Sequence, residues 1–201
     1  MSTKRKSATN SKNLVKVGRV SGAKPGKVSL SVSFSADQIC GDLLWSFKEG
    51  TTGRNLLLST GRQAGAVHFR RGETVIVEVH GTGPKGTFVK ANVKFAHLVS
   101  IPHTGTDGFS APSPFSEEAA VVAVEDWGNV KMAVDPSSGL MTSSQRSRTP
   151  LLVTQKTGRW GLSLVLSIQI QMVDADGVKS TANRVFSFDP EAEVGTGTDP
   201  D

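Results

Sequence analysis

The feature that most constrains this chain is a row of seven apolar residues spaced two apart. They are Trp160, Leu162, Leu164, Leu166, Ile168, Ile170 and Met172. A helix would spread these side chains around its surface, whereas a strand turns all of them toward one face of a sheet. The row therefore predicts a long strand whose apolar face is buried against a second sheet.

A turn sequence and a returning segment follow this row. Asp174-Ala-Asp-Gly177 is typical of a tight turn, because glycine readily adopts the positive φ that such turns require. Residues 178–189 then return as the pairing strand. We therefore predict a β-hairpin over residues 159–189.

Eight further segments have the alternation or composition of strands. They cover residues 28–34, 42–47, 55–59, 64–69, 74–80, 87–101, 119–125 and 130–134. We expect 42–47 and 55–59 to form one hairpin, and 64–69 and 74–80 to form a second one through the turn at 70–73. Residues 102–118 and 135–148 are rich in Pro, Gly or Ser and are predicted to be loops.

The alternation in residues 87–101 is long enough to predict which side chains face the core. The apolar side is expected to consist of Val89, Ala91, Val93, Phe95, His97, Val99 and Ile101. No segment has a persuasive helical pattern. The fold class is therefore predicted as all-β, an antiparallel β-sandwich of about ten strands with jelly-roll or Greek-key-like connections.

The charge is unevenly distributed along the chain. Residues 1–27 contain eight of the 23 basic residues and no acid, and the remainder has 15 basic against 18 acidic residues. We therefore divide the chain into a flexible basic arm at 1–26, a β-sandwich domain at 27–197 and an acidic tail at 198–201. A basic arm either binds polyanions or keeps the protein in solution, and both interpretations remain open.

Several features favour a cytoplasmic protein that does not enter a membrane. The basic N-terminus is not followed by the apolar stretch of a signal peptide, and no run of about 18 apolar residues is present. Cys40 is the single cysteine and cannot form an intrachain disulfide. Beside the apolar Ile39, we expect this thiol to behave as a small hydrophobic side chain.

No recognisable catalytic or metal-binding motif is present. The four histidines lack HxH or HExxH spacing, and GxSxG, GxGxxG and Walker sequences are absent. We therefore predict that the protein is not an enzyme and has no catalytic residue, metal or cofactor. Three residues in predicted loops, His103, Asp107 and Trp127, are candidates for ligand binding. The indole of Trp127 either packs on its own loop or offers a flat surface to a sugar.

The last third of the chain resembles the AidA/PixA family of bacterial inclusion body proteins. The resemblance is carried by Gly158-Arg159-Trp160, the alternating strand to Met172, and the phrase Phe186-Ser-Phe-Asp-Pro-Glu191 with Val194-Gly195. The segment 107–115 is also similar, so the resemblance extends over about residues 28–197. It implies a small cytoplasmic β-sandwich protein, expressed under quorum-sensing or stationary-phase control, of a family in which some members accumulate as inclusions.

These observations favour a non-enzymatic, self-associating accessory protein of the AidA/PixA type, present as a homo-oligomer. A carbohydrate-binding module is the alternative. A further alternative is a coat-like protein whose basic arm contacts nucleic acid through Lys4, Arg5, Lys6 and Lys12. We do not expect nucleic acid as a partner, because the arm is less dense in arginine than coat-protein arms usually are.

Overall fold

The computed structural model describes residues 26–50, 56–57, 66–103, 111–188 and 191–194. Every regular element in these ranges is a β-strand. The strands are β1 (Lys27–Ser35), β2 (Leu44–Glu49), β3 (Val67–Phe69), β4 (Thr74–Gly83), β5 (Phe88–Pro102), β6 (Val121–Ala123), β7 (Lys131–Val134), β8 (Met141–Arg146), β9 (Leu151–Leu152), β10 (Gly158–Val173), β11 (Lys179–Phe188) and β12 (Glu191–Val194).

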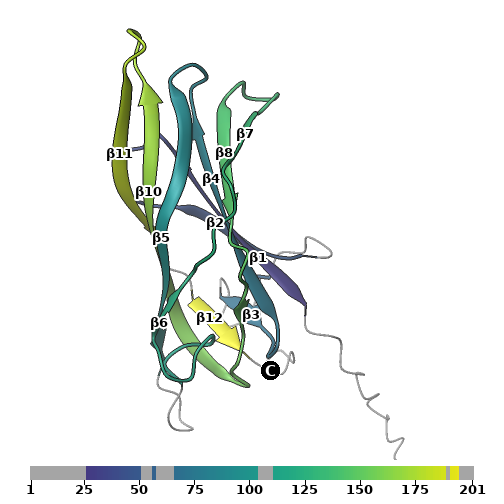
Figure 1. The fold of residues 1–201 in the computed structure, drawn as a ribbon. Helices are drawn as coiled ribbons and strands as arrows, with labels where there is room; N and C mark the ends of the chain where they lie inside the picture. The colour runs from purple at the N-terminus through teal and green to yellow at the C-terminus, as the bar shows by residue number, and fades with distance from the viewer. Residues whose placement is uncertain (1–25, 51–55, 58–65, 104–110, 189–190, 195–201) are drawn as a thin grey trace, which may run out of the picture.

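The strands form two sheets of six strands each (Figure 1). Sheet A has the order β2-β1-β4-β8-β7, with β9 also paired to β4; sheet B has the order β3-β12-β10-β5-β6, with β11 also paired to β10. Most pairs are antiparallel, and β1 with β4 and β12 with β3 are parallel. The predicted all-β sandwich is confirmed, with twelve strands in the described part instead of about ten.

The apolar row of β10 forms the centre of the core, as its spacing predicts. Residues from Trp160 to Ile170 at spacing two are no more than 2% exposed, and Met172 is partly buried. The side chains that share this core from sheet A include the alternating apolar residues Val28, Leu30, Val32 and Phe34 of β1. The hairpin of β10 and β11 is also confirmed, and Gly177 in its turn has a φ of 79°.

The predicted core face of β5 is wrong over half its length because β5 contains two bulges. Phe95 pairs with Ser167 of β10 and Val93 pairs with Ile168, so Lys94 is an extra residue on β5. An extra residue of this kind reverses the alternation beyond it, because side chains point to opposite faces in turn.

The two bulges move five predicted core residues away from the fully buried side, since Val89 is itself the extra residue of the second bulge and the other four follow Lys94. Ala91 and Val93 are buried as expected, whereas beyond the bulge at Lys94 the buried residues are Ala96 and Leu98. Phe95 is 45% exposed and Ile101 is 64% exposed. The prediction was therefore wrong for Val89, Phe95, His97, Val99 and Ile101.

Of the two hairpins predicted in the first half of the chain, that of 64–69 with 74–80 is wrong, and that of 42–47 with 55–59 is described only in part. β2 pairs with β1, and of the segment expected to pair with it only residues 56–57 are described, with Leu56 N donating to Phe47 O at 3.0 Å. β3 and β4 lie in different sheets, so the turn at 70–73 carries the chain across the sandwich. Local alternation predicted these strands but could not identify their partners.

Cys40 also differs from its prediction, since it is exposed next to an Ile39 that is 99% exposed. The guanidinium of Arg184 on β11 donates to the carbonyl oxygens of Ile39 and Cys40, each at 3.3 Å. The Gln38 amide donates to the Cys40 carbonyl as well, at 3.0 Å. This loop is therefore held through its backbone, and its apolar side chains face outward.

The segment predicted as a loop at 135–148 contains β8, whose inward side is polar. Ser143 and Gln145 are buried and reach across to β5 in the other sheet. The Ser143 hydroxyl accepts a hydrogen bond from Ala91 N at 3.1 Å and donates to Ala91 O at 3.0 Å. The Gln145 side-chain oxygen accepts from Val93 N at 2.8 Å. These bonds give hydrogen-bond partners to the backbone of β5 at Ala91 and Val93, which β6 does not reach because it pairs with residues 97–99.

The domain boundaries lie largely beyond the described residues. The basic arm at 1–25 and the acidic tail at 198–201 are outside them, and the described strands run from Lys27 to Val194. Within the described ranges, no helix has the length and apolar character needed to cross a membrane. The division of the chain into arm, sandwich and tail stays a prediction.

Leu166→Ala should lower the free energy of unfolding by about 3 kcal/mol, because it removes three buried carbon atoms and leaves a cavity between the sheets. Urea denaturation measures this change. Gln169→Ala, on the other side of the same strand, should cost less than about 0.5 kcal/mol. Equal effects of the two substitutions would contradict the burial of the β10 row.

Ser143→Ala should destabilise the protein by about 1–3 kcal/mol, because Ala91 N–H and C=O would lose their shared partner in a buried place. The neighbouring Ser144→Ala, on the outer side of β8, is the matched control and should change stability by less than about 0.5 kcal/mol. Thermal unfolding of both variants checks the difference. A Ser143→Ala protein as stable as the control would rule out this bridge between the sheets.

Glu73→Gln should stabilise the protein at neutral pH. Burial raises the pKa of the Glu73 carboxyl above its ordinary value of 4.5, more than the 2.8 Å hydrogen bond from Arg70 N lowers it. The stability that the wild-type residue contributes is therefore full below pH 4.5 and is lost as pH rises through the raised pKa. The advantage of the glutamine variant should grow between pH 4 and pH 7 in urea denaturation, and a pH-independent difference would contradict this.

Candidate functional site

A hollow of about 810 Å³ lies on the outer face of sheet A, over β4 and β8. Its lining includes the outward side of β4, where Thr74, Ile76, Glu78 and His80 alternate with buried residues of the core face. The volume is in the range of sites that bind small ligands. The alternation that builds the core on one side of β4 therefore also presents a polar surface on the other.

The hollow lies where β8 and β9 leave a gap beside β4. β8 pairs with β4 as far as Arg146, and β9 resumes the pairing at Leu151. Between them Ser147 reaches back to β4: its backbone N donates to Val77 O at 2.9 Å, and its hydroxyl accepts from Val77 N at 3.0 Å. The residues beside this interruption, Arg146 to Arg148 and Pro150, line the hollow.

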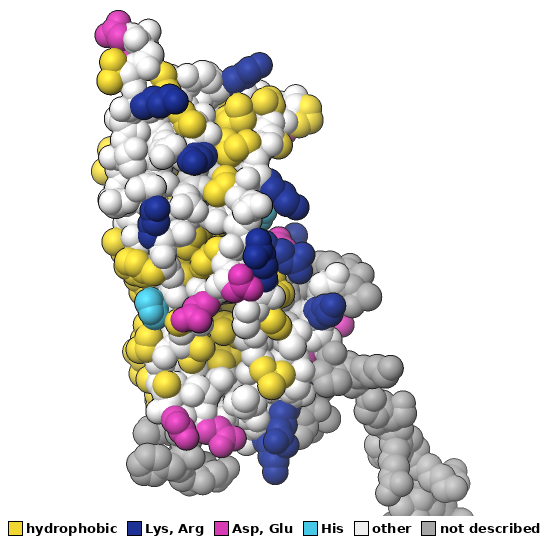
Figure 2. Space-filling model, in the orientation of Figure 1, with side chains coloured by type: hydrophobic (Ala, Val, Ile, Leu, Met, Phe, Trp, Pro, Cys, Tyr) yellow, Lys and Arg dark blue, Asp and Glu magenta, His cyan; other side chains and the backbone are white. Residues whose placement is uncertain are grey.

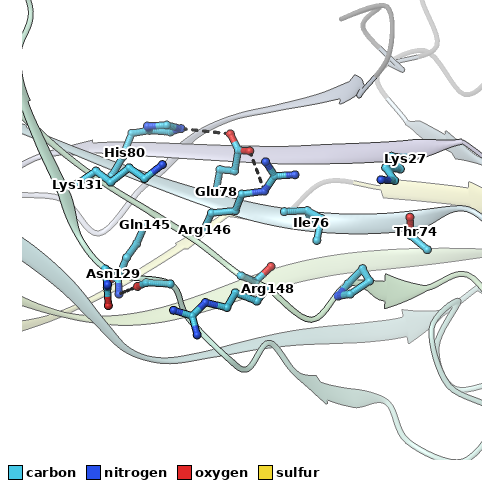
Figure 3. A pocket seen from close by; sticks show the side chains of 14 residues that line it. Lys27, Thr74, Ile76, Glu78, His80, Asn129, Lys131, Gln145, Arg146 and Arg148 are labelled. Carbon is cyan, nitrogen blue, oxygen red and sulfur yellow. Dashed lines mark hydrogen bonds and ion pairs between the residues drawn. The ribbon is translucent and has the colours of Figure 1, made fainter.

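Basic side chains predominate in the lining of this hollow, which we call the basic groove. They are Lys27, Lys131, Arg146 and Arg148, and Glu78 is the acidic residue among them. Glu78 Oε1 lies 3.4 Å from Arg146 Nε, and Glu78 Oε2 lies 3.8 Å from His80 Nε2 (Figure 3). Since one carboxylate faces four bases, the groove is suited to an anionic ligand.

The rim of the basic groove is formed by residues 126–129. Gly128 N donates to Arg146 O at 2.9 Å, and Arg148 N donates to Asp126 O at 2.8 Å, which ties this segment to the end of β8. The Asp126 carboxylate lies 3.6 Å from Arg148 Nη1. Asp126 has a φ of 53°, and no other non-glycine residue in the described ranges has a positive φ. Strained backbone of this kind is concentrated at functional sites.

A second hollow, of about 490 Å³, adjoins the basic groove and is called the Trp127 hollow. Besides Trp127 it is lined by Lys90, Asn92, Gly128, Asn129, Val130, Met132 and Gln145. It shares Gly128, Asn129 and Gln145 with the basic groove. The indole is half-buried, and its Nε1 donates to Val124 O at 3.0 Å. Trp127 therefore packs on its own segment and also lines a hollow, so the two interpretations of its sequence context are compatible.

The structure separates the predicted ligand-binding residues that it describes. The Trp127 indole donates to the backbone oxygen of Val124. The backbone N–H of Val124 in turn donates to Ala96 O on β5. His103 follows Ala96 by seven residues, just past the end of β5. At strand spacing this is about 20 Å. His103 is exposed, and its backbone N donates to Arg159 O at 2.9 Å. Asp107 and the basic residues Lys4, Arg5, Lys6 and Lys12 lie outside the described residues.

The sequence analysis missed the residues that line the basic groove. Arg146 and Arg148 lie in the segment predicted to be a loop, and Glu78 and Lys131 lie in segments predicted only as strands. A signal was present, because Ser143, Gln145 and Ser147 alternate with Ser144, Arg146 and Arg148. The apolar residues that normally identify a strand are missing from this pattern.

No metal centre is evident in the part of the chain that the structure describes. None of these residues form a group of three or more His, Cys, Asp or Glu side chains that could hold an ion. The chemistry that the two hollows offer is ion pairing and hydrogen bonding. They are therefore candidate binding sites.

β7 presents a different kind of surface, because it is the edge strand of sheet A and all four of its residues are exposed. Met132 is 39% exposed and Val134 is 43% exposed, and Leu140 beside them is also exposed. Figure 2 shows hydrophobic side chains gathered near the outer end of β7 and β8. An uncovered apolar edge strand is a template for pairing with another strand.

The turn that joins β7 to β8 is fixed by Asp135. Its carboxylate accepts hydrogen bonds from Ser137 N at 2.9 Å, from the Ser138 hydroxyl at 2.7 Å and from the Ser137 hydroxyl at 2.8 Å. These bonds, led by the one from Ser137 N, lower the pKa of Asp135 from 3.8 to about 2. The apolar edge is therefore presented on an ordered hairpin.

Within the described ranges, the residues that carry the family resemblance pack in the core or shape its packing. Trp160 is fully buried and its indole donates to Ala111 O at 2.8 Å. Gly158 has a φ of 145°, and a Cβ at this position would overlap the Trp160 ring. Phe186 packs 4.6 Å from Phe34 between ring centres. The glycine, tryptophan and phenylalanine of the motif are thus explained by packing.

Comparison with known proteins gives one similarity to a solved structure. No family model matches the sequence, and no curated protein matches it. The chain is similar to the crystal structure of an inclusion body protein, PixA, from Burkholderia cenocepacia J2315, with 10% sequence identity and a TM-score of 0.29. The similarity covers 92% of this chain and 99% of that one. The resemblance of this chain to the AidA/PixA family is carried by the sequence motifs described above.

Proposed function

We propose that this protein is a non-enzymatic accessory protein that self-associates through the edge of sheet A. The observation that carries the proposal is β7, whose residues Lys131–Val134 are all exposed and include two large apolar side chains. The resemblance to AidA/PixA proteins supports the same function, since some members accumulate as inclusions. We also propose that the protein is cytoplasmic and bacterial and is expressed under quorum-sensing or stationary-phase control. This part of the proposal rests on the resemblance alone.

Two edge strands of sheet B, β11 and β6, are better protected against pairing. Most exposed side chains of β11 are charged or polar, including Lys179, Asn183 and Arg184, although Val185 is also exposed. β6 is three residues long and lies between Glu118 and Glu125. Short strands and charged side chains are the usual means by which proteins keep edges from associating. β7 has Lys131 at one end and only Met, Ala and Val after it.

The partner we propose for β7 is β7 of a second copy. Two such strands related by a two-fold axis would pair antiparallel and join the two copies of sheet A into one continuous sheet. Met132 and Val134, which lie on one face of the strand, would then meet their counterparts across the axis. A homodimer is the smallest assembly that this arrangement produces.

Met132→Lys/Val134→Lys should weaken self-association at least about tenfold, because it replaces the two large apolar side chains on one face of the proposed strand pair with charges. Sedimentation velocity over a range of concentrations measures the effect. Met132→Pro, which removes a backbone N–H that points away from β8, tests the same pairing independently. Val178→Lys/Val185→Lys, which charges two apolar residues exposed on β11 or just before it, is the matched control.

The wild-type protein and the β11 control should form the same oligomer, while the β7 variants should be monomers with unchanged circular dichroism. A wild-type protein that is monomeric at every concentration would overturn the proposal. Loss of the oligomer in the β11 control alone would place the interface on sheet B and would equally refute the role of β7.

A further inference from the structure

We infer that the basic groove and the Trp127 hollow form one binding site for an acidic oligosaccharide, whose sugars carry carboxylate or sulfate groups. The inference goes beyond self-association, and its variants leave β7 unchanged, although Lys131 and Met132 of β7 line the two hollows. It rests on three properties of the site, which are the placement of its basic side chains, its neutral hydrogen-bonding groups and its indole.

The basic side chains are placed to hold anionic groups along one side of a bound chain. Arg146 ends β8 and Arg148 follows it by two residues, which separates their Cα atoms by about 7 Å in an extended chain. Lys131 pairs with Ser144 and so continues the row in the other direction. Lys27 pairs with Thr74 near the far end of the groove.

The guanidinium groups of Arg146 and Arg148 each contact one carboxylate and keep further N–H donors for a ligand. Arg146 is joined to Glu78 through its Nε at 3.4 Å, and Arg148 is joined to Asp126 through Nη1 at 3.6 Å. An arginine has five N–H donors, so each side chain is oriented by one partner and still has donors for a ligand. Arginine recognises carboxylate and similar oxyanions with paired donors, which favours such groups in the ligand.

The rest of the lining matches the hydroxyl groups of sugars. Thr74, Asn129 and Ser144 offer neutral donors and acceptors, and the carboxylate of Glu78 accepts hydrogen bonds from hydroxyl groups. The groove follows β4 from Thr74 to His80, which is about 20 Å at strand spacing and enough for several sugar units. The Trp127 hollow continues the site past Asn129 and adds an indole. Indole faces provide the apolar contact that the flat side of a sugar ring needs.

The same features disfavour single-stranded nucleic acid as the ligand. Proteins that bind single strands supply several aromatic side chains on which successive bases stack. The described residues that line the basic groove include no Phe or Trp, and the Trp127 hollow includes one indole.

Isothermal titration calorimetry of the full-length protein tests the inference with four probes. These are an alginate hexasaccharide, a sulfated heparin hexasaccharide, neutral maltohexaose and the oligonucleotide dT12. Arg146→Gln/Arg148→Gln removes two charges from the groove, and Trp127→Ala removes the indole. Lys94→Gln/Lys179→Gln removes two exposed charges elsewhere and is the matched control. All variants keep the basic residues 1–25, so differences between them report on the groove.

At least one acidic hexasaccharide should bind, and its affinity should fall at least about tenfold in the double arginine variant. Trp127→Ala should weaken binding of the same probe, and the control should stay within about twofold of the wild type. Preference for the alginate or the heparin probe would identify carboxylate or sulfate as the recognised group. Absence of binding, equal losses in the control, or dT12 binding as tightly with the same dependence on Arg146 and Arg148 would overturn the inference.

Discussion

Packing of the β10 row against sheet A is the interaction on which the rest of the structure depends. Side chains from Trp160 to Ile170 are almost fully buried, and they share one core with the alternating residues of β1 and β4. Each large residue of such a row contributes on the order of 2 kcal/mol through burial. Because β10 also pairs with β5, β11 and β12, it fixes the positions of three neighbouring strands in sheet B.

Polar side chains connect the two sheets where apolar packing ends. Ser143 and Gln145 of β8 bond to the backbone of β5, and Ser147 fills the interruption in the ladder beside β4. Since these residues point inward, their neighbours Ser144, Arg146 and Arg148 point outward. The inward side chains of this alternating segment thus connect the two sheets, and its outward side chains line the basic groove. The groove lies where the pairing of β4 is interrupted between β8 and β9.

Two surfaces remain available for interaction, and they differ in character. The edge formed by β7 is short and apolar, which suits a strand of another copy. The groove and the Trp127 hollow are basic and polar, with strained backbone at Asp126 on their rim, which suits a ligand with charges and hydroxyl groups. Lys131 belongs to both, because it begins β7 and also lines the groove. Association of two copies would therefore bring their grooves close to the shared sheet.

The sequence by itself determined the features that depend on local alternation. It predicted the β10 row, the hairpin with β11 and the all-β fold, because burial of one face leaves a period of two in the residues. Tertiary structure decided strand partners, since β3 and β4 share a turn but lie in different sheets, and it decided which face of β5 is buried, since one extra residue at Lys94 reverses the pattern. It also decided the groove, because Lys27, Glu78, Lys131 and Arg146 come from four strands that only sheet pairing brings together.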